Sequence, residues 1–215
     1  MTFTIEVPRK NGNRQVLVTT DNYLYVSTPK CASCSIKQSI IKKNLGLDRV
    51  HNAHKHLAKA GFLTEPGGHK KWKAAVDRSP FSFCVIRNPY SRLASLWRHL
   101  GEQGGVPGFR RFVRRICDLP DVRRNIHCRT QVRVLTASKD PEFMNYYDVV
   151  LRMEKLDEQW VSSGVADRTG IPQLFHFHYT PKRHTPAELW TPEIADLVEV
   201  SYRSDLQYGG YHRPV

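Results

Sequence analysis

A lysine and two serines lie close together in a run of small residues early in the chain. Residues 28–35 are Thr-Pro-Lys-Cys-Ala-Ser-Cys-Ser, and they join a β-branched stretch to residues at helical spacing. Backbone N–H groups at the start of a helix, together with the helix dipole, stabilise a phosphate group. Lys30 would add a positive charge, and Ser33 and Ser35 would add hydroxyl donors. The segment is therefore predicted to wrap a phosphate group.

This segment differs from the phosphate loop of nucleoside triphosphatases. That loop has the pattern G-x-x-x-x-G-K-[ST], with its lysine near the end. Residues 28–35 contain no glycine, and Lys30 stands at the front of the segment. A magnesium–ATP site is therefore not expected here.

A second cationic segment follows another short apolar run. Arg87 comes directly after residues 81–86, and Ser95 lies within the helical pattern that follows. Ligands of open α/β sheets bind beyond the carboxyl ends of the strands, so this segment would lie close to the first one. Two neighbouring anion sites would suit one ligand with two phosphate groups.

The elements that must position these segments alternate between strands and helices. Runs of β-branched and aromatic residues predict strands, and apolar residues three and four apart predict helices. The expected strands are 15–19, 23–27, 81–86 and 147–151, and the expected helices are 35–45, 91–100, 108–119 and 191–206. The alternation predicts an α/β fold: one domain, residues 1–215, with a mainly parallel, P-loop-like central sheet flanked by helices.

The composition narrows the class of protein without choosing a ligand. The chain has 215 residues, 40% of them hydrophobic, and a formal net charge of +13. It has no run of about 18 apolar residues, and its first ten residues carry charges where a signal peptide would be apolar. A cytoplasmic protein without a membrane segment is therefore expected. The positive charge would attract nucleic acid, anionic glycan or nucleotide alike.

Four segments resemble motifs of the carbohydrate sulfotransferases that use 3′-phosphoadenosine 5′-phosphosulfate (PAPS), notably the heparan sulfate 2-O-sulfotransferase group and the small bacterial members of sulfotransferase family 2. Residues 29–35 resemble the 5′-phosphosulfate loop of this family, and residues 87–95 resemble its 3′-phosphate motif, R-x-P-x-x-R-x-x-S. Residues 147–156 and 202–211 are similar to late family segments. The family usually has threonine at two loop positions that are Cys31 and Cys34 here.

The resemblance implies transfer of a sulfuryl group from PAPS, as co-substrate, to a hydroxyl group, with no metal required. The residues that it implies for nucleotide binding are Lys30, Ala32, Ser33, Cys34, Ser35, Arg87, Ser95 and Arg183. Lys30 would also be catalytic, because negative charge grows on the oxygen that bridges phosphorus and sulfur as the S–O bond breaks. The acceptor would be an anionic or neutral glycan or a small hydroxylated molecule, with a carbohydrate as the expected case.

Transfer also needs a base that takes the proton of the acceptor hydroxyl group. Histidine titrates near neutrality, and the segment 51–56 contains three histidines between the two nucleotide motifs. In related enzymes a histidine base lies in this interval, and Lys55-His56 resembles a Lys-His pair of small bacterial members. His56 is therefore ranked first, His54 second and His51 third. His127 and the histidines at 176, 178 and 184 are alternatives that would line the acceptor cleft.

Two other classes of protein fit part of the sequence. Cys31 and Cys34 form C-x-x-C between a strand and a helix, as in thioredoxin-like redox proteins. The net charge fits a nucleic-acid-binding protein, although no known reader motif is present. Neither alternative explains the segment from Arg87 to Ser95, so nucleic acid is not the expected partner, and the five cysteines are expected to be free thiols.

Overall fold

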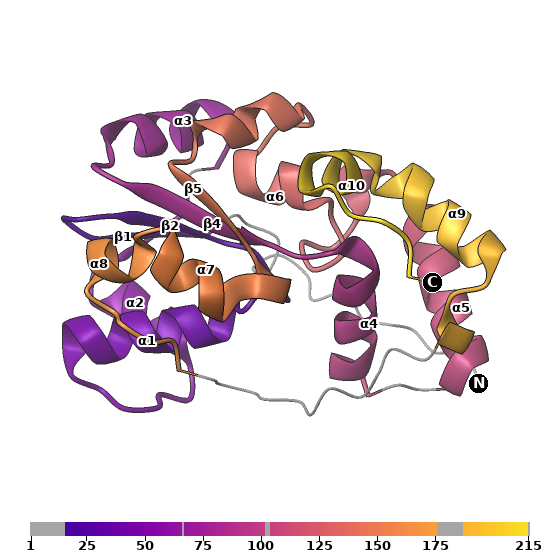
Figure 1. Ribbon diagram of the computed structural model, residues 1–215, viewed down its shortest axis with the longest axis horizontal. Coiled ribbons are helices and arrows are strands. Elements are labelled where there is room, and N and C mark those ends of the chain that lie inside the picture. The colour runs from indigo at the N-terminus through magenta and orange to yellow at the C-terminus, as the bar shows by residue number, and fades with distance from the viewer. Residues whose placement is uncertain (1–15, 66, 102–103, 176–186, 215) are drawn as a thin grey trace.

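A five-stranded mixed sheet lies at the centre of the described chain (Figure 1). The computed structural model describes residues 16–65, 67–101, 104–175 and 187–214. The strands are β1 (Val16–Thr19), β2 (Leu24–Ser27), β3 (Leu63–Thr64), β4 (Ser82–Ile86) and β5 (Val149–Arg152), in the order β3-β1-β2-β4-β5. The pairs β2–β4 and β4–β5 are parallel, and the pairs β1–β2 and β1–β3 are antiparallel. The predicted α/β fold is confirmed, but the sheet is mixed and not mainly parallel: its parallel strands lie in the half that carries both cationic segments.

Helices cover both faces of this sheet and extend beyond its carboxyl edge. Their bounds are α1 (Ser33–Leu45), α2 (Ala53–Lys59), α3 (His69–Arg78), α4 (Pro89–His99), α5 (Gly105–Cys117), α6 (Gln131–Thr136), α7 (Leu156–Ser162), α8 (Val165–Thr169), α9 (Pro192–Ser201) and α10 (Arg203–Gly209). Short 3₁₀ helices are η1 (Asp121–Arg123), η2 (Pro141–Tyr146), η3 (Met153–Lys155) and η4 (Ala187–Leu189). Figure 1 shows α1, α2, α7 and α8 on one face of the sheet, with α3 and α6 on the other.

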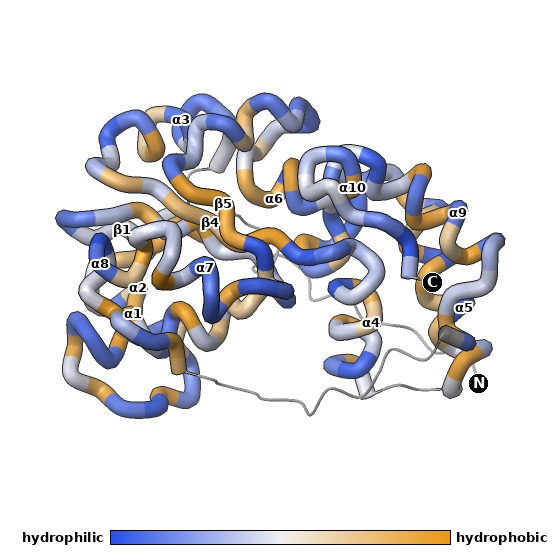
Figure 2. Tube along the Cα trace, in the orientation of Figure 1, coloured by the Kyte–Doolittle hydropathy of each residue, from blue (hydrophilic) through white to orange (hydrophobic). Residues whose placement is uncertain are grey.

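The two-residue period of the central strands divides the core between these faces. In β4, Phe83 and Val85 pack toward α1 and α7, whereas Cys84 and Ile86 pack toward α3 and α6. Both faces of the strand are thus buried, which is typical of parallel strands in α/β proteins. Figure 2 shows the same distribution, with hydrophobic sheet strands and hydrophilic outer turns on the helices.

A third apolar cluster lies beyond the carboxyl edge of the sheet. It joins α4, α5 and α9 through residues that include Leu93, Phe109 and Val198, which are at most 2% exposed. This cluster supports α4 from the side away from the sheet. The start of α4 is therefore fixed at the end of β4, where Arg87 leaves the strand.

Most of the predicted elements are observed within a few residues of their expected ends. The exception is 191–206, which forms α9 and α10 with a break at Tyr202 (φ −120°, ψ 24°). Tyr202 is fully buried, and its hydroxyl group donates to the carbonyl oxygen of Cys128. This contact with a distant segment interrupts the helical pattern and turns α10 back toward α6.

Within the described ranges, every helix is too short or too polar to cross a membrane. A cytoplasmic location stays a prediction.

Phe83 is the residue whose truncation should most weaken the sheet. Its ring is fully buried, and it contacts the rings of Tyr25 (5.1 Å between centroids) and Trp160 (5.6 Å). Phe83→Ala should lower the free energy of unfolding by about 3–5 kcal/mol, because a cavity replaces these contacts. Urea unfolding monitored by circular dichroism measures it. Val161→Ala, at a side chain that is 62% exposed, is the control and should change stability little. A Phe83 variant as stable as the control would contradict this account of the core.

Candidate functional site

The loop between β2 and α1 has an unusual backbone for a segment without glycine. Lys30 (φ 67°) and Ala32 (φ 55°) both adopt the left-handed conformation, and the N–H of Cys31 donates to the carbonyl oxygen of Thr28. Such a conformation costs a non-glycine residue about 1–3 kcal/mol, so the surrounding structure must hold it. The loop ends at the first turn of α1, which has no side-chain cap at Ala32. The N–H groups of this first turn lack partners within the helix, as an anion site requires.

Side chains from α4 and α6 hold this loop in place. The Nε of Arg92 donates to the carbonyl oxygen of Pro29 (3.1 Å), and Nη1 of Arg87 donates to that of Lys30 (3.0 Å). The Sγ of Cys31 donates to Oε1 of Gln131 (3.1 Å). Three consecutive loop residues are thus tied to elements that follow much later in the chain.

Arg92 is a buried arginine whose side chain donates to backbone carbonyl oxygens. Its side chain is 1% exposed, and besides Pro29 it donates to the carbonyl oxygens of Arg129 (2.6 Å) and Ile126 (3.3 Å). A charged group can remain buried only when its donors have partners. The second arginine of the motif R-x-P-x-x-R-x-x-S therefore joins the loop before α1 to residues 126–129.

Arg87 lies at the carboxyl end of β4 and faces the first loop. Its Nε donates to Oγ of Ser91 (2.9 Å), so with the bond to Lys30 it uses two of its five N–H donors. Asn88 caps α4 by accepting from the N–H of Tyr90 (3.0 Å). Ser95 lies one turn after Ser91 and is half-buried. The structure thus brings the two predicted anion segments together, with Arg87 touching both.

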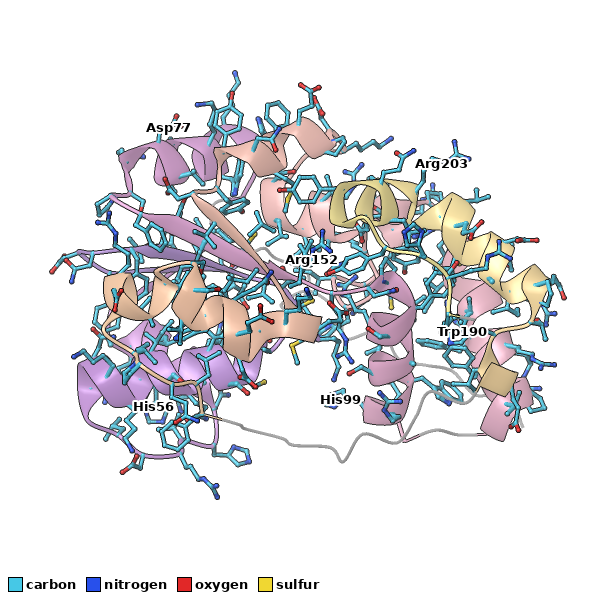
Figure 3. All side chains as sticks on the ribbon, viewed as in Figure 1. His56, Asp77, His99, Arg152, Trp190 and Arg203 are labelled. Atoms are coloured by element: carbon cyan, nitrogen blue, oxygen red, sulfur yellow. The ribbon has the colours of Figure 1, made fainter. Side chains whose placement is uncertain are left out.

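Glu154, just after the end of β5, contacts the loop that follows β4. Its Oε1 accepts from the N–H of Asn88 (2.8 Å), and its Oε2 accepts from the hydroxyl group of Tyr211 (3.1 Å). The side-chain amide of Asn88 also donates to the carbonyl oxygen of His212 (3.2 Å). The segment 147–156 therefore contacts the Arg87 loop through Glu154, and the segment 202–211 reaches it through the bond of Tyr211 to Glu154. Figure 3 shows the neighbouring Arg152 at this end of the sheet.

The cations at this edge have few negative neighbours. Burial lowers the pKa of Lys30, and the charges of Arg87 and Arg98 lower it further, although Cys34 acts in the opposite direction. Burial also lowers the pKa of Lys37, one turn into α1. Among the described residues, none of the ion pairs involves Lys30, Lys37 or Arg98. A bound anion would reduce the repulsion among these cations and compensate the cost of burying their charges. The residues present therefore fit a phosphate- or sulfate-bearing ligand.

Helix α2 separates the histidines of segment 51–56. His54 and His56 are two positions apart, about 200° around the helix, so they point to opposite sides. Burial lowers the pKa of His54, and the charge of Lys37 lowers it further while Glu65 raises it. His54 therefore lies within electrostatic reach of Lys37, although its side chain is exposed and that of His56 is half-buried. Figure 3 shows His56 below α1 in the view, well away from Arg152.

His127 is a further histidine near the cationic loops. Its Nδ1 lies 2.7 Å from Oδ1 of Asn125, an oxygen that also accepts from the N–H of His127, so Nδ1 carries the proton. Burial, followed by the charges of Arg92 and Lys30, lowers the pKa of His127 to about 4. At neutral pH the ring is uncharged, and its Nε2 can accept a hydrogen bond.

The cysteines oppose the redox alternative. All five are free, and the pair in question differs in environment: Cys31 is buried and Cys34 is exposed. Burial raises the pKa of Cys31 to about 12, so its thiol stays protonated and donates to Gln131. Redox exchange needs a thiolate, which this environment disfavours.

Other basic side chains of the structure have partners of their own, and four residues singled out in the sequence lie outside the described residues. In the basic helix α5, Arg110 donates to the carbonyl oxygen of Glu188 (2.9 Å), and Arg114 forms a bidentate ion pair with Glu193. A groove of about 760 Å³ lies beside α9 and α10, but its Arg213 is paired with Asp196 and Glu199. In residues 16–65, 67–101, 104–175 and 187–214, no three His, Cys, Asp or Glu side chains gather as a metal site. Arg183 and the histidines at 176, 178 and 184 lie outside those residues.

The profile of the sulfotransferase family matches residues 14–212, nearly the whole chain. The chain therefore belongs to the sulfotransferase family, whose members transfer sulfuryl groups. No curated protein and no solved structure matches it.

The buried, neutral state of His127 should make stability depend on pH. Its pKa is about 4 in the folded protein and near the usual 6.5 when unfolded, so between these values the unfolded chain binds more protons. The free energy of unfolding should therefore fall as the pH drops from 6.5 toward 4. His127→Asn should reduce this slope in urea titrations at several pH values. His51→Asn, at an exposed position, is the control. Equal slopes for His127→Asn and wild type would refute the assignment.

Proposed function

We propose that this protein transfers the sulfuryl group of PAPS to a hydroxyl group, with a carbohydrate as the acceptor. The observation that carries the proposal is the bond from the Arg87 guanidinium to the carbonyl oxygen of Lys30, since it joins two cationic loops at one edge of the sheet. Their spacing within one site suits a nucleotide with phosphate groups at both the 5′ and 3′ positions. Arg87 and Ser95 would hold the 3′-phosphate.

The loop before α1 would hold the 5′ end of the nucleotide. Lys30 supplies the charge, Ser33 and Ser35 supply hydroxyl donors, and the backbone from Ala32 to Ser35 supplies N–H groups at the helix start. Cys34 is exposed in this first turn, where it replaces a threonine of related enzymes. A thiol donates weakly, so its contribution there rests on its backbone N–H.

The chemistry needs a cation at the leaving oxygen and a base at the acceptor. Bound PAPS supplies an activated sulfuryl group whose S–O bond to the 5′-phosphate breaks as the acceptor oxygen bonds to sulfur. Lys30 stabilises the negative charge that this oxygen gains. His54 takes the proton of the acceptor hydroxyl group. Its lowered pKa and its position toward Lys37 favour it over His56, which the sequence ranks first.

The acceptor would approach from the side of Lys37, His54 and His127. The cations there favour an acceptor that carries a sulfate or carboxylate group, and the neutral Nε2 of His127 offers a hydrogen-bond acceptor for a sugar hydroxyl. An anionic glycan meets both conditions. The nucleic-acid alternative is supported by net charge alone.

Binding of adenosine 3′,5′-bisphosphate tests the nucleotide site. Wild type should bind it in calorimetry with a chelator present. Arg87→Ala should weaken binding by about 1.5–3 kcal/mol, the range for hydrogen bonds to a charged group, and Ser95→Ala by less. Arg114→Ala, in the exposed pair with Glu193, is the control and should bind like wild type. Tighter binding of ATP than of the bisphosphate, or unchanged binding by Arg87→Ala, would defeat the proposal.

Turnover as a function of pH tests the base. In wild type the rate should rise with pH through an ionisation below 6.5, because the pKa of His54 is lowered in the folded protein. His54→Asn should lose this limb and about 10²–10⁴-fold in kcat, with nucleotide binding retained. His56→Asn, on the opposite side of α2, is the matched control. If His56→Asn loses turnover and His54→Asn keeps it, the base is His56.

A further inference from the structure

Gln131 is a buried amide at the first position of α6 whose hydrogen-bonding capacity is fully used. It is 2% exposed. Its Nε2 donates to the carbonyl oxygen of Arg87 (2.7 Å) and to Oδ2 of Asp205 (3.3 Å). Its Oε1 accepts from the N–H of Arg87 (2.8 Å) and from Sγ of Cys31 (3.1 Å). An amide side chain has two N–H donors and two lone pairs on oxygen, and all four are engaged.

The two bonds between the Gln131 side chain and the Arg87 backbone continue the hydrogen bonding of β4 by one residue. The ladder between β4 and β5 ends at the pair Ile86 and Arg152, so Arg87 lies just past the last strand pairing. The amide of Gln131 takes the place of a neighbouring peptide group, because it engages both the N–H and the carbonyl oxygen of Arg87. Fixing these two groups fixes the direction in which the Arg87 side chain leaves the backbone.

The bond from Cys31 connects the Gln131 amide to the loop before α1. Cys31 lies between Lys30 and Ala32, the two residues in the left-handed conformation. Its thiol donates to the same oxygen that accepts from the N–H of Arg87. Oε1 of Gln131 therefore contacts both loops at one point, in addition to the bonds that Arg87 and Arg92 donate to the first loop.

Asp205 fixes which way the amide points. Its Oδ2 accepts from the backbone N–H of Gln131 (2.7 Å), and its Oδ1 accepts from that of Val132 (3.0 Å), so it caps α6 from α10. It is 3% exposed. A buried carboxylate needs donors, and it therefore holds the NH₂ group of Gln131 on its own side and leaves the oxygen for Arg87 and Cys31.

We propose that Gln131, oriented by Asp205, is a positioning residue that couples the 5′ and 3′ phosphate loops so that one nucleotide engages both. The inference rests on the proposed function for the identity of that nucleotide. Gln131 touches no ligand in this scheme. It acts through Cys31 and Arg87, and its contribution is the fixed spacing between the two anion sites.

A comparison of nucleotide affinities distinguishes a coupling of the two loops from a general loss of protein stability. A nucleotide with both phosphates gains from simultaneous engagement only if the loops are held at the right spacing. Gln131→Met should therefore weaken adenosine 3′,5′-bisphosphate by about 10- to 100-fold, while 5′-AMP and 3′-AMP change only about two- to threefold. Asp205→Asn should shift the same ratio in the same direction, since it removes the charge that orients the amide.

Gln38 offers a matched control. It is 4% exposed, and its amide engages both the N–H and the carbonyl oxygen of Val50, so its bonds join α1 to residue 50 and not to the Arg87 loop. Gln38→Met should lower the melting temperature as Gln131→Met does, with the ratio of bisphosphate to mononucleotide affinity unchanged. If Gln131→Met weakens all three nucleotides equally, or leaves the bisphosphate unaffected, the coupling is refuted.

Hydrogen exchange without nucleotide tests the coupling independently of the proposed function. Gln131→Met should speed exchange in two peptides at once, one covering Cys31 and the other covering Arg87, relative to Gln38→Met. Faster exchange at Arg87 alone would overturn the coupling. Failure of wild type to bind the bisphosphate would instead overturn the proposed function and leave the exchange result to decide the role of Gln131.

Discussion

The structure depends on holding a glycine-free loop in a conformation that its residues disfavour. Lys30 and Ala32 each carry a cost of about 1–3 kcal/mol for a positive φ. Three hydrogen bonds offset it: Arg92 and Arg87 donate to the carbonyl oxygens of Pro29 and Lys30, and the thiol of Cys31 donates to Gln131. The carbonyl groups of Pro29 and Lys30 are thus occupied by the two arginines. In the proposed function, the N–H groups at the start of α1 remain available for the anion.

The same arrangement lowers the stability of the protein without ligand and favours the binding of an anion. The cations that hold the loop and line its edge repel one another, and burial lowers the pKa of Lys30 and of Lys37. A nearby carboxylate would relieve this repulsion but would also compete with the ligand. Glu154 accepts hydrogen bonds from the neutral groups of Asn88 and Tyr211; burial lowers the pKa of Arg87, and the charge of Glu154 opposes that shift only in part. The site therefore keeps its positive charge for an incoming anion.

Local patterns in the sequence predicted the parts of the site that are continuous in the chain. The strand, loop and helix around Lys30, and those around Arg87, follow from periodicity and turn residues. The role of Gln131 could not be predicted, since its partners Cys31 and Asp205 lie 100 and 74 residues away. The proposed preference for His54 over His56 also rests on the structure, because the sequence does not show that the charge of Lys37 on α1 acts on His54.

The long sequence separation of these contacts bears on how the site forms during synthesis. Strand β4 and the loop at Lys30 are made early, but the residues that lock them come last: Asp205 orients Gln131, and His212 accepts from Asn88 across 124 positions. A nascent chain that has emerged only as far as α9 has its sheet strands and Gln131, but it lacks Asp205, which orients the Gln131 amide. The supporting contacts of the two loops are thus completed only once residues 205–212 have been synthesised.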